Sequence, residues 1–170
     1  MSYSEEQIAN MVQPTKVHRN VYTDPEIFNL EMERIWAKSW IYIGHKSQVP
    51  EQGNYVTLNY GRVPVVMVRD NDDVVHVLHN RCGHKGTKLV DKPCGKIPTF
   101  RCCYHGWRYR LDGKLLGVPH MAGYEGTDFN KDDPQYSMQQ LRSESVRGFV
   151  FATMSDDAPD VRTWMGGAAD

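Results

Sequence analysis

The sequence predicts a mainly β fold: a small sandwich that carries a metal-binding subdomain at one tip, with one helix near the N-terminus. From residue 40 onwards, short runs rich in β-branched and aromatic residues alternate with glycine- and aspartate-containing turns, which is typical of antiparallel strands. Two of the loops between these runs each carry one cysteine and one histidine. A chain of 170 residues, 40% of them hydrophobic, is long enough for one domain with a core.

The N-terminal residues 1–39 are predicted to form an extension that ends in a helix. Residues 1–23 are mostly polar and are expected to be irregular. Asp24 suits a helix N-cap, and Pro25 suits the first helical position. One apolar stripe follows at helical spacing and is expected to pack against the domain until the helix ends near Lys38. The stripe consists of Phe28, Met32, Ile35 and Trp36.

Residues 40–154 are predicted to form the β domain itself. The strands are expected at Trp40–Ile43, Tyr55–Asn59, Pro64–Arg69, Val74–Leu78, Thr99–Cys102, Trp107–Leu111 and Gly148–Thr153. The pair Asp112-Gly113 is a strong hairpin signal after one of them. Residues 155–170 are rich in Asp, Ala, Gly and Pro, and we expect them to form a linker.

Composition excludes several classes of function. A net charge of −1 provides no field for capturing nucleic acid or an anionic membrane. The N-terminus lacks the basic and apolar regions of a signal peptide, and no stretch is long enough to cross a bilayer. We therefore expect a cytoplasmic protein, in which thiols stay reduced. Four cysteines in that compartment favour metal binding or free thiols over disulfides.

Two short ligand pairs dominate the sequence. Cys82 and His84 are separated by one residue, and Cys102 and His105 are separated by two. Thiolate and imidazole are the side chains that bind borderline and soft metals best. Glycines beside the ligands allow the backbone to bend tightly and to approach a metal cluster closely. These glycines are Gly83, Gly86 and Gly106.

Two metal centres fit such a set of four ligands. A structural zinc site would use two cysteines and two histidines around one ion. Zinc fingers usually present both cysteines before both histidines, whereas each loop here supplies one of each. That alternation favours a Rieske [2Fe–2S] cluster, in which one iron takes both cysteines and the other takes both histidines.

The surrounding residues resemble one known family. The runs Cys82-Gly83-His84-Lys85-Gly86 and Cys102-Cys103-Tyr104-His105-Gly106-Trp107 look like the Rieske domain of the large (alpha) subunit of bacterial aromatic-ring-hydroxylating dioxygenases. The similarity also includes Pro25–Pro50, Gly53-Asn54-Tyr55, Arg147–Phe151 and Asp157-Ala158-Pro159, and it covers about residues 17–165. It implies a Rieske-type iron–sulfur β-sandwich with a small cluster-binding subdomain.

The resemblance also implies roles for individual residues. Cys82 and Cys102 would hold the buried iron, while His84 and His105 would hold the outer iron and form the electron exit. Lys85, Tyr104 and Trp107 would surround the cluster together with the three glycines, and Trp107 would shield it from water. Arg81, Lys85 and Arg108 form either a docking site for an acidic donor or an ordinary solvated surface. His18, His45, His76, His79 and His120 lack a matching motif and are not expected to bind metal.

High-potential respiratory Rieske proteins carry an additional cysteine in each loop, and the two form a disulfide. Thr87 and Tyr104 stand at those positions here, so the disulfide is absent. Cys94 and Cys103 are expected to be free thiols. We expect few polar hydrogen bonds to the sulfurs and hence a low-potential centre, reduced by a ferredoxin or by an NAD(P)H-dependent flavin reductase.

Members of this family carry a second, larger domain that holds a mononuclear iron. Nothing after Val118 offers its ligands, because only His120 remains downstream. We therefore expect an electron-relay domain without catalytic residues, which serves a catalytic domain in a neighbouring alpha subunit of a trimer. A beta subunit is a further candidate partner. The complete enzyme would hydroxylate an aromatic substrate with O2. A free-standing Rieske ferredoxin and a zinc-stabilised binding module are the two alternatives.

Overall fold

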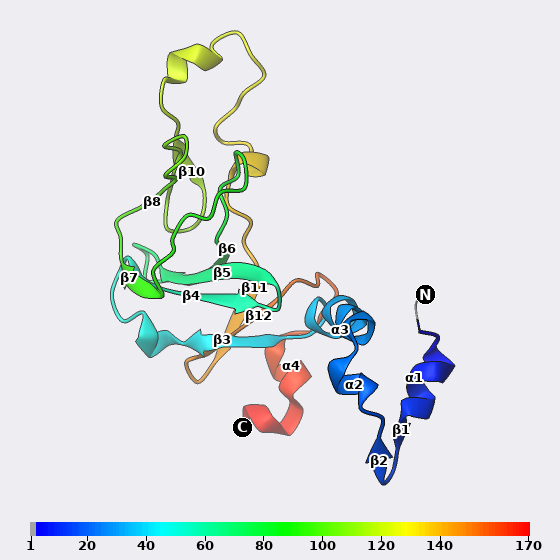
Figure 1. The fold of residues 1–170 in the computed structure, drawn as a ribbon. Helices are drawn as coiled ribbons and strands as arrows, with labels where there is room; N and C mark the ends of the chain where they lie inside the picture. Colours follow the sequence, from blue (N-terminus) through cyan, green and yellow to red (C-terminus); the bar gives the residue numbers. More distant parts are fainter. Residues whose placement is uncertain (1–2) are drawn as a thin grey trace.

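The computed structural model describes residues 3–170, and its centre is a sandwich of two antiparallel sheets (Figure 1). The four-stranded sheet has the order β6-β5-β4-β7. Its strands are β4 Asn54–Tyr60, β5 Val63–Arg69, β6 Val75–His79 and β7 Cys94–Lys96. The three-stranded sheet has the order β11-β12-β3. Its strands are β3 Ile41–His45, β11 Arg142–Val146 and β12 Phe149–Thr153. The predicted mainly β fold is confirmed.

A smaller third sheet forms the subdomain at one tip that the sequence predicts to bind metal, here called the metal-binding subdomain. It has the order β10-β9-β8. Its strands are β8 Phe100–Arg101, β9 Arg108–Tyr109 and β10 Leu115–Gly117. A long excursion after β10 contains two short helical turns, Met121–Tyr124 and Pro134–Tyr136, before the chain returns to the sandwich at β11. In Figure 1 this excursion rises above β8 and β10, at the opposite end from α4.

The central strand β5 supplies side chains to two cores. Val66 and Val68 pack with the residues of the metal-binding subdomain, whereas Val65 and Met67 pack between the two sheets of the sandwich. All four side chains are fully buried. Because successive side chains of a strand point to opposite faces, β5 anchors the subdomain and the sandwich to the same backbone. Full burial of each such side chain contributes about 1.5–3 kcal/mol.

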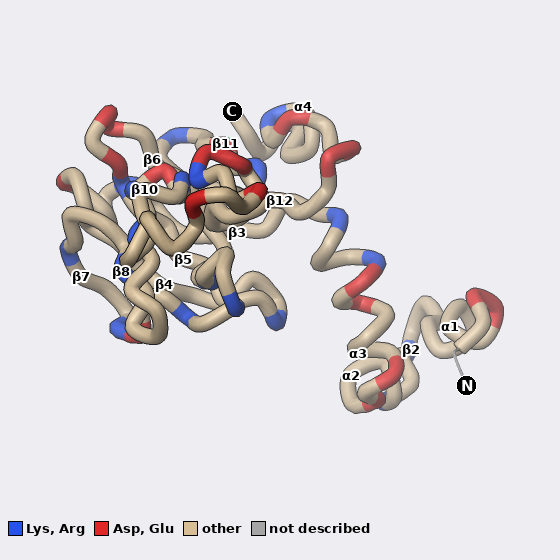
Figure 2. Tube along the Cα trace, turned by 90° about the horizontal axis from the view of Figure 1, so that it is seen from above, with Lys and Arg blue, Asp and Glu red and all other residues tan. Residues whose placement is uncertain are grey.

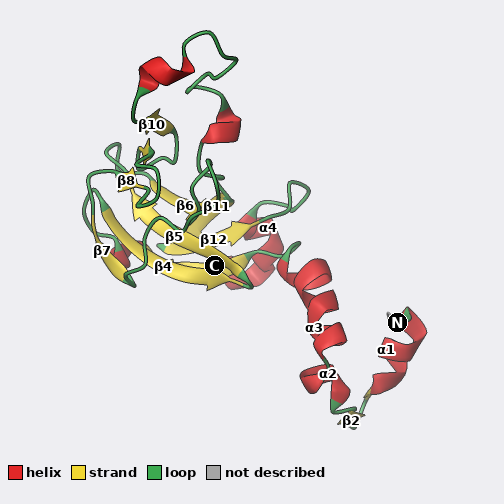
Figure 3. Cartoon of the chain, turned by 45° about the horizontal axis from the view of Figure 1, so that its top comes forward, coloured by secondary structure: helices red, strands yellow, loops and turns green. Residues whose placement is uncertain are grey.

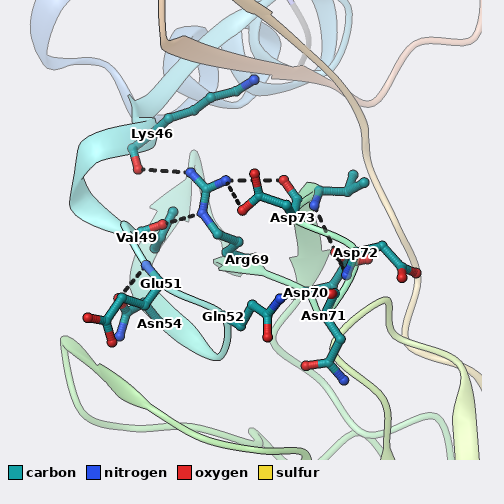
Figure 4. Close-up of polar contacts among 11 residues, drawn as sticks. Lys46, Val49, Glu51, Gln52, Asn54, Arg69, Asp70, Asn71, Asp72 and Asp73 are labelled. Carbon is teal, nitrogen blue, oxygen red and sulfur yellow. Dashed lines mark hydrogen bonds and ion pairs between the residues drawn. The ribbon is translucent and has the colours of Figure 1, made fainter.

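A polar cluster at the end of β5 ties the β5–β6 turn to the segment after β3 (Figure 4). The Arg69 guanidinium donates to the Val49 carbonyl at 2.6 Å and to the Asp73 carboxylate at 2.9 Å. The Asp70 carboxylate accepts from the Val74 amide at 2.8 Å and lies 2.7 Å from the His76 ring. These bonds give hydrogen-bond partners to backbone groups of the β5–β6 turn and of the segment after β3 that would otherwise be unpaired.

The first part of the chain is more regular than predicted. It forms α1 Glu5–Met11, a hairpin of β1 Val12–Gln13 and β2 Lys16–Val17, and α2 Asn20–Thr23. The prediction of an irregular segment is wrong because Ser4 and Gln7 form a capping box that begins α1, and the Ser-x-x-Gln spacing of this box is a helix-start signal. The segment projects away from the sandwich (Figure 3), and α1 buries none of its residues.

The next helix, α3 Pro25–Glu31, begins where the sequence predicts. The Asp24 carboxylate accepts a hydrogen bond from the Glu26 amide at 2.9 Å. The prediction that the whole apolar stripe packs against the domain is wrong, however, because Phe28 is 42% and Ile35 54% exposed. The helix continues as a π-helical turn over Met32–Trp36. Such a turn contains an additional residue and therefore shifts the side chains away from ideal helical spacing.

The last part of the chain also differs from the expected linker. Residues Val161–Met165 form α4, which begins with an Asp160 cap on the Thr163 amide at 3.0 Å. Val161 packs in a third cluster with Trp40 and Val146. The Trp40 indole N–H donates to the Pro159 carbonyl at 2.8 Å, which fixes the approach to α4. The composition of residues 155–170 does not indicate this helix, because α4 is short and buries only one face.

The seven expected strands are present with shifted ends. Besides β1 and β2, the prediction missed β7, β10 and β11, which are short or carry polar side chains along much of their length. Among the helices of residues 3–170, none combines the length and the apolar character that a bilayer crossing requires.

We predict that Val161→Ala lowers the free energy of unfolding by about 1–3 kcal/mol, because it leaves a cavity beside Trp40. Urea denaturation would measure the change. The adjacent exposed substitution Arg162→Ala is the control and should stay within about 0.5 kcal/mol of the unmodified protein. Equal stability of the two variants would show that α4 does not pack against the sandwich in solution.

Candidate metal centre

Two loops from different sheets meet in the subdomain and share one hydrogen-bond pattern. In the loop after β6, the Cys82 amide donates to the Thr87 carbonyl at 2.8 Å, and the Gly86 amide donates to the Cys82 carbonyl at 2.9 Å. In the loop between β8 and β9, the Cys102 amide donates to the Trp107 carbonyl at 2.8 Å. The Gly106 amide there donates to the Cys102 carbonyl at 3.1 Å. The two loops are therefore built alike around their cysteines.

Two glycine requirements explain this local geometry. Gly86 and Gly106 adopt φ of +75° and +72°, which other residues adopt only at a cost. Gly83 is needed for a different reason, because a Cβ there would lie 2.4 Å from the Tyr136 carbonyl oxygen. The first loop thus packs directly against the backbone of the excursion after β10.

The buried side of the site consists of two thiols. Cys82 and Cys102 are each 2% exposed, and both belong to one buried cluster. Burial raises the pKa of Cys82. Burial also acts to raise the pKa of Cys102, but the backbone amides of His105 and Tyr104 outweigh it and lower this pKa overall. Amide groups directed at sulfur favour the thiolate, which is the form that binds metal.

The outer side of the site consists of two imidazoles. The ring centroids of His84 and His105 lie 4.7 Å apart, and His105 is exposed. Burial, followed by the neighbouring His105 and Lys85, lowers the pKa of His84. A lowered pKa favours the neutral ring that ligates metals.

One atom tests whether a metal fits this arrangement. His84 Nδ1 is buried and has no hydrogen-bond partner within residues 3–170. A buried polar atom without a partner is costly and calls for an explanation. A metal bound at this nitrogen, together with thiols and imidazoles grouped as two separate pairs, fits a two-iron cluster.

Aromatic rings cover both imidazoles. Trp107 is buried and stacks on His84, with ring centroids 4.6 Å apart and planes 5° from parallel. Tyr104 is exposed and stacks on His105 at 3.7 Å. Phe129, in the excursion after β10, contacts the Trp107 ring edge-on at 5.9 Å. The rings hold the imidazoles in place and restrict water on the His84 side.

Sequence reasoning missed Tyr109, which connects the two loops. Its hydroxyl lies 3.0 Å from Cys82 Sγ and accepts from the Gly83 amide at 2.9 Å. Burial, followed by the neighbouring Cys82, raises the pKa of Tyr109, so the hydroxyl keeps the proton that it can donate to sulfur. The one available signal was its place between Arg108 and Arg110, as the inward-facing residue of an alternating strand.

The Tyr109 hydroxyl gives Cys82 Sγ a side-chain hydrogen bond from a residue 27 positions away in the sequence. Spacing alone could not reveal this contact.

Asn80 is a second residue that sequence reasoning missed. It is 1% exposed, and its side-chain amide bonds the backbone of Leu89 and of Val90. These bonds close the first ligand loop at its base. A buried asparagine between a strand and a Cys-x-His motif was the available signal.

The remaining candidates lie outside this set. None of the four cysteines forms a disulfide, and Cys94 and Cys103 are exposed. Lys85 is exposed beside His84 and lines a pocket of about 260 Å³ with His79 and Arg81. His76 contacts Asp70 at 2.7 Å in the β5–β6 corner, and no other metal-binding side chains join them within residues 3–170.

Known proteins resemble this chain over most of its length. The family model described as "Rieske [2Fe-2S] domain" matches residues 39–139. The biphenyl dioxygenase subunit alpha of Metapseudomonas furukawaii is 34% identical over 98% of this chain and 38% of its own length. The benzene 1,2-dioxygenase subunit alpha of Pseudomonas putida is 36% identical over 90% of this chain and 33% of its own. The chain therefore spans between a third and two-fifths of these relatives.

Solved structures show the same fold. A naphthalene 1,2-dioxygenase mutant bound to phenanthrene superposes with a TM-score of 0.88 and 31% identity, over 99% of this chain and 37% of that one. The apo form of a quaternary ammonium Rieske monooxygenase superposes with a TM-score of 0.80 and 31% identity, over 99% and 48%. Since the matching family model covers more than half of the chain, and the paired loops carry its ligand types, this protein belongs to the Rieske [2Fe–2S] domain family.

Proposed function

We propose that this chain is the electron-transfer domain of an aromatic-ring-hydroxylating oxygenase. It would relay single electrons from a ferredoxin or an NAD(P)H-dependent flavin reductase to a mononuclear non-haem iron in a catalytic domain. The observation that carries the proposal is the meeting of two buried thiols and two outer imidazoles on equivalent loops. The oxygenase subunits among its relatives support this assignment over a free carrier, because the match to one of them covers 98% of the chain.

We assign Cys82 and Cys102 to the inner iron and His84 and His105 to the outer iron. The bound cluster would supply reversible one-electron chemistry. The protein contributes buried thiols with amides directed at them and keeps His105 exposed. An exposed imidazole can hydrogen-bond a carboxylate of a partner, which supports an electron exit at this tip. Trp107 excludes water on the other imidazole.

The rest of the chain would place this domain within a larger enzyme. Residues 40–154 would form the Rieske domain, 1–39 an extension and 155–170 the connection toward a catalytic domain. The exposed apolar residues of the extension, such as Tyr22 and Ile35, are suited to contacts with other subunits. We therefore propose a trimer of alpha subunits, with a beta subunit as a further partner, located in the cytoplasm.

We predict that protein purified anaerobically contains iron and acid-labile sulfide and, when reduced, shows the EPR signal of a Rieske centre. His84→Cys and His105→Cys should each lower the midpoint potential by on the order of 100 mV or prevent assembly, because a thiolate adds negative charge. Potentiometry would measure this, with His18→Cys as the control. Stoichiometric zinc without sulfide would contradict the proposed function.

We predict that Tyr109→Phe lowers the midpoint potential by tens of millivolts, since it removes a hydrogen bond to Cys82 Sγ that stabilises the more negative, reduced state. A differential contribution of about 1 kcal/mol corresponds to about 40 mV for one electron. Tyr104→Phe is the matched control, because it removes a tyrosine hydroxyl from an exposed residue and keeps the ring that stacks on His105. Equal potentials in both variants would show that the Tyr109 hydroxyl does not tune the centre.

We predict that Cys103→Ser retains the visible spectrum of the cluster, whereas Cys102→Ser loses it. Cys103 is exposed and Cys102 is buried beside Cys82. Absorption spectroscopy and iron analysis of the two variants would distinguish these adjacent residues. Loss of colour in Cys103→Ser alone would reverse the assignment.

A further inference from the structure

Positive charge is concentrated in the metal-binding part of the chain. Between His79 and Leu111, eight lysines and arginines stand against a single acidic residue, Asp91. The whole chain carries 20 basic and 21 acidic residues, so the remainder is acidic. The near-zero net charge therefore conceals a strong asymmetry. In Figure 2, β8 lies at the end of the molecule opposite α3.

The third sheet has one aromatic face and one arginine face. Phe100 lies opposite Tyr109 across β8 and β9, and both side chains are fully buried. Arg101 lies opposite Arg108, and both are exposed. Because side chains alternate along a strand, exposed Arg110 shares the face of Arg108. We call Arg101, Arg108 and Arg110 the arginine face.

The arginine face has no acidic partner within the chain. None of its three side chains makes an ion pair or a side-chain hydrogen bond among residues 3–170. Like charges directly opposite each other on neighbouring strands are destabilising. The nearby Asp112 carboxylate is already paired with Lys114 at 3.4 Å. The fold thus maintains a repulsion between Arg101 and Arg108 that an external carboxylate would relieve.

A pocket between two of these arginines suits a carboxylate. It measures about 270 Å³ and is lined by Arg101, Gly106, Arg108, Val118 and Pro119. Guanidinium groups bind carboxylates with two parallel hydrogen bonds. Val118 and Pro119 form an apolar wall beside the two guanidinium groups.

The arginine face is also close to the buried thiols. Tyr109 lies between Arg108 and Arg110 in the chain and points the opposite way, with its hydroxyl 3.0 Å from Cys82 Sγ. Gly106, which lines the pocket, directly follows His105. A protein docked on this face would be separated from the buried cysteines by the thickness of one strand. The exposed imidazole of His105 would remain free to contact the electron acceptor.

We propose that the arginine face is the docking surface of the electron donor, and that this donor is a small redox protein with aspartates and glutamates around its own centre. The inference rests on the proposed function. One electron leaves the reduced donor, which is oxidised, and reduces the [2Fe–2S] cluster of this chain by one electron; no group is transferred. An acidic donor is favoured over a nucleic acid or a membrane because the rest of this chain is acidic and would repel an extended polyanion.

The test uses a reduced plant-type [2Fe–2S] ferredoxin, which is acidic, as the probe. The variant R101E/R108E/R110E is compared with the control R34E/K38E/R162E, which makes the same change in charge at exposed sites near α3 and α4, away from the third sheet (Figure 1). Stopped-flow absorption measures the bimolecular reduction rate, and interferometry on immobilised ferredoxin measures the dissociation constant.

We expect reduction of the arginine-face variant to be at least about tenfold slower at low salt, with a correspondingly weaker affinity. The difference should close at high ionic strength, where charges are screened. The control should stay within about twofold of the unmodified protein, since steering depends on charges near the contact. Should the glutamate variant fail to fold, R101Q/R108Q/R110Q provides the same comparison with a smaller charge change.

Two results would overturn the inference while the proposed function stands. One is an unchanged rate and affinity in a variant whose cluster retains its EPR signal after photoreduction with deazaflavin. The other is preferential, arginine-dependent binding of phosphatidylserine vesicles or duplex DNA over ferredoxin. Absence of a cluster from the unmodified protein would instead overturn the proposed function, and the inference with it.

Discussion

The burial of Cys82 and Cys102 in one shared core is the constraint on which the other features of the site depend. The two cysteines belong to loops from different sheets, so their meeting requires both sheets to be held in one register. The Tyr109 hydroxyl contributes to this by contacting Cys82 Sγ and the Gly83 amide together. Gly83 must in turn lack a side chain, because the backbone of Tyr136 lies against it.

The sandwich provides rigidity for this small site. The subdomain has short strands and a long excursion, and side chains of the four-stranded sheet complete its core. Strand β5 packs Val66 and Val68 against the subdomain and Val65 and Met67 against the second sheet. Displacement of one ligand loop would therefore disturb both cores. Rigid placement is what a one-electron relay requires, because reorganisation of ligands between oxidation states slows transfer.

The parts of the site differ in chemistry and in exposure to solvent. Thiols lie at the buried end, an exposed imidazole lies at the tip, and arginines cover the outer face of the third sheet. Burial protects the sulfurs, exposure of His105 permits contact with a partner, and the arginine face can attract a second partner from another direction. One small sheet thus has an inner face that serves the cluster and an outer face suited to recognition.

The sequence alone determined the ligand types, their spacing, the glycines between them, the mainly β fold and the start of α3 at Pro25. These features depend on residues close together in the chain, whose chemistry and backbone preferences are local. Only the tertiary structure decided which residues meet across the chain. Tyr109 at Cys82, α4 against Trp40 and the arginine face all depend on strand register and packing between distant segments. Composition and periodicity carry no information about such pairings, because each partner satisfies only its own local pattern.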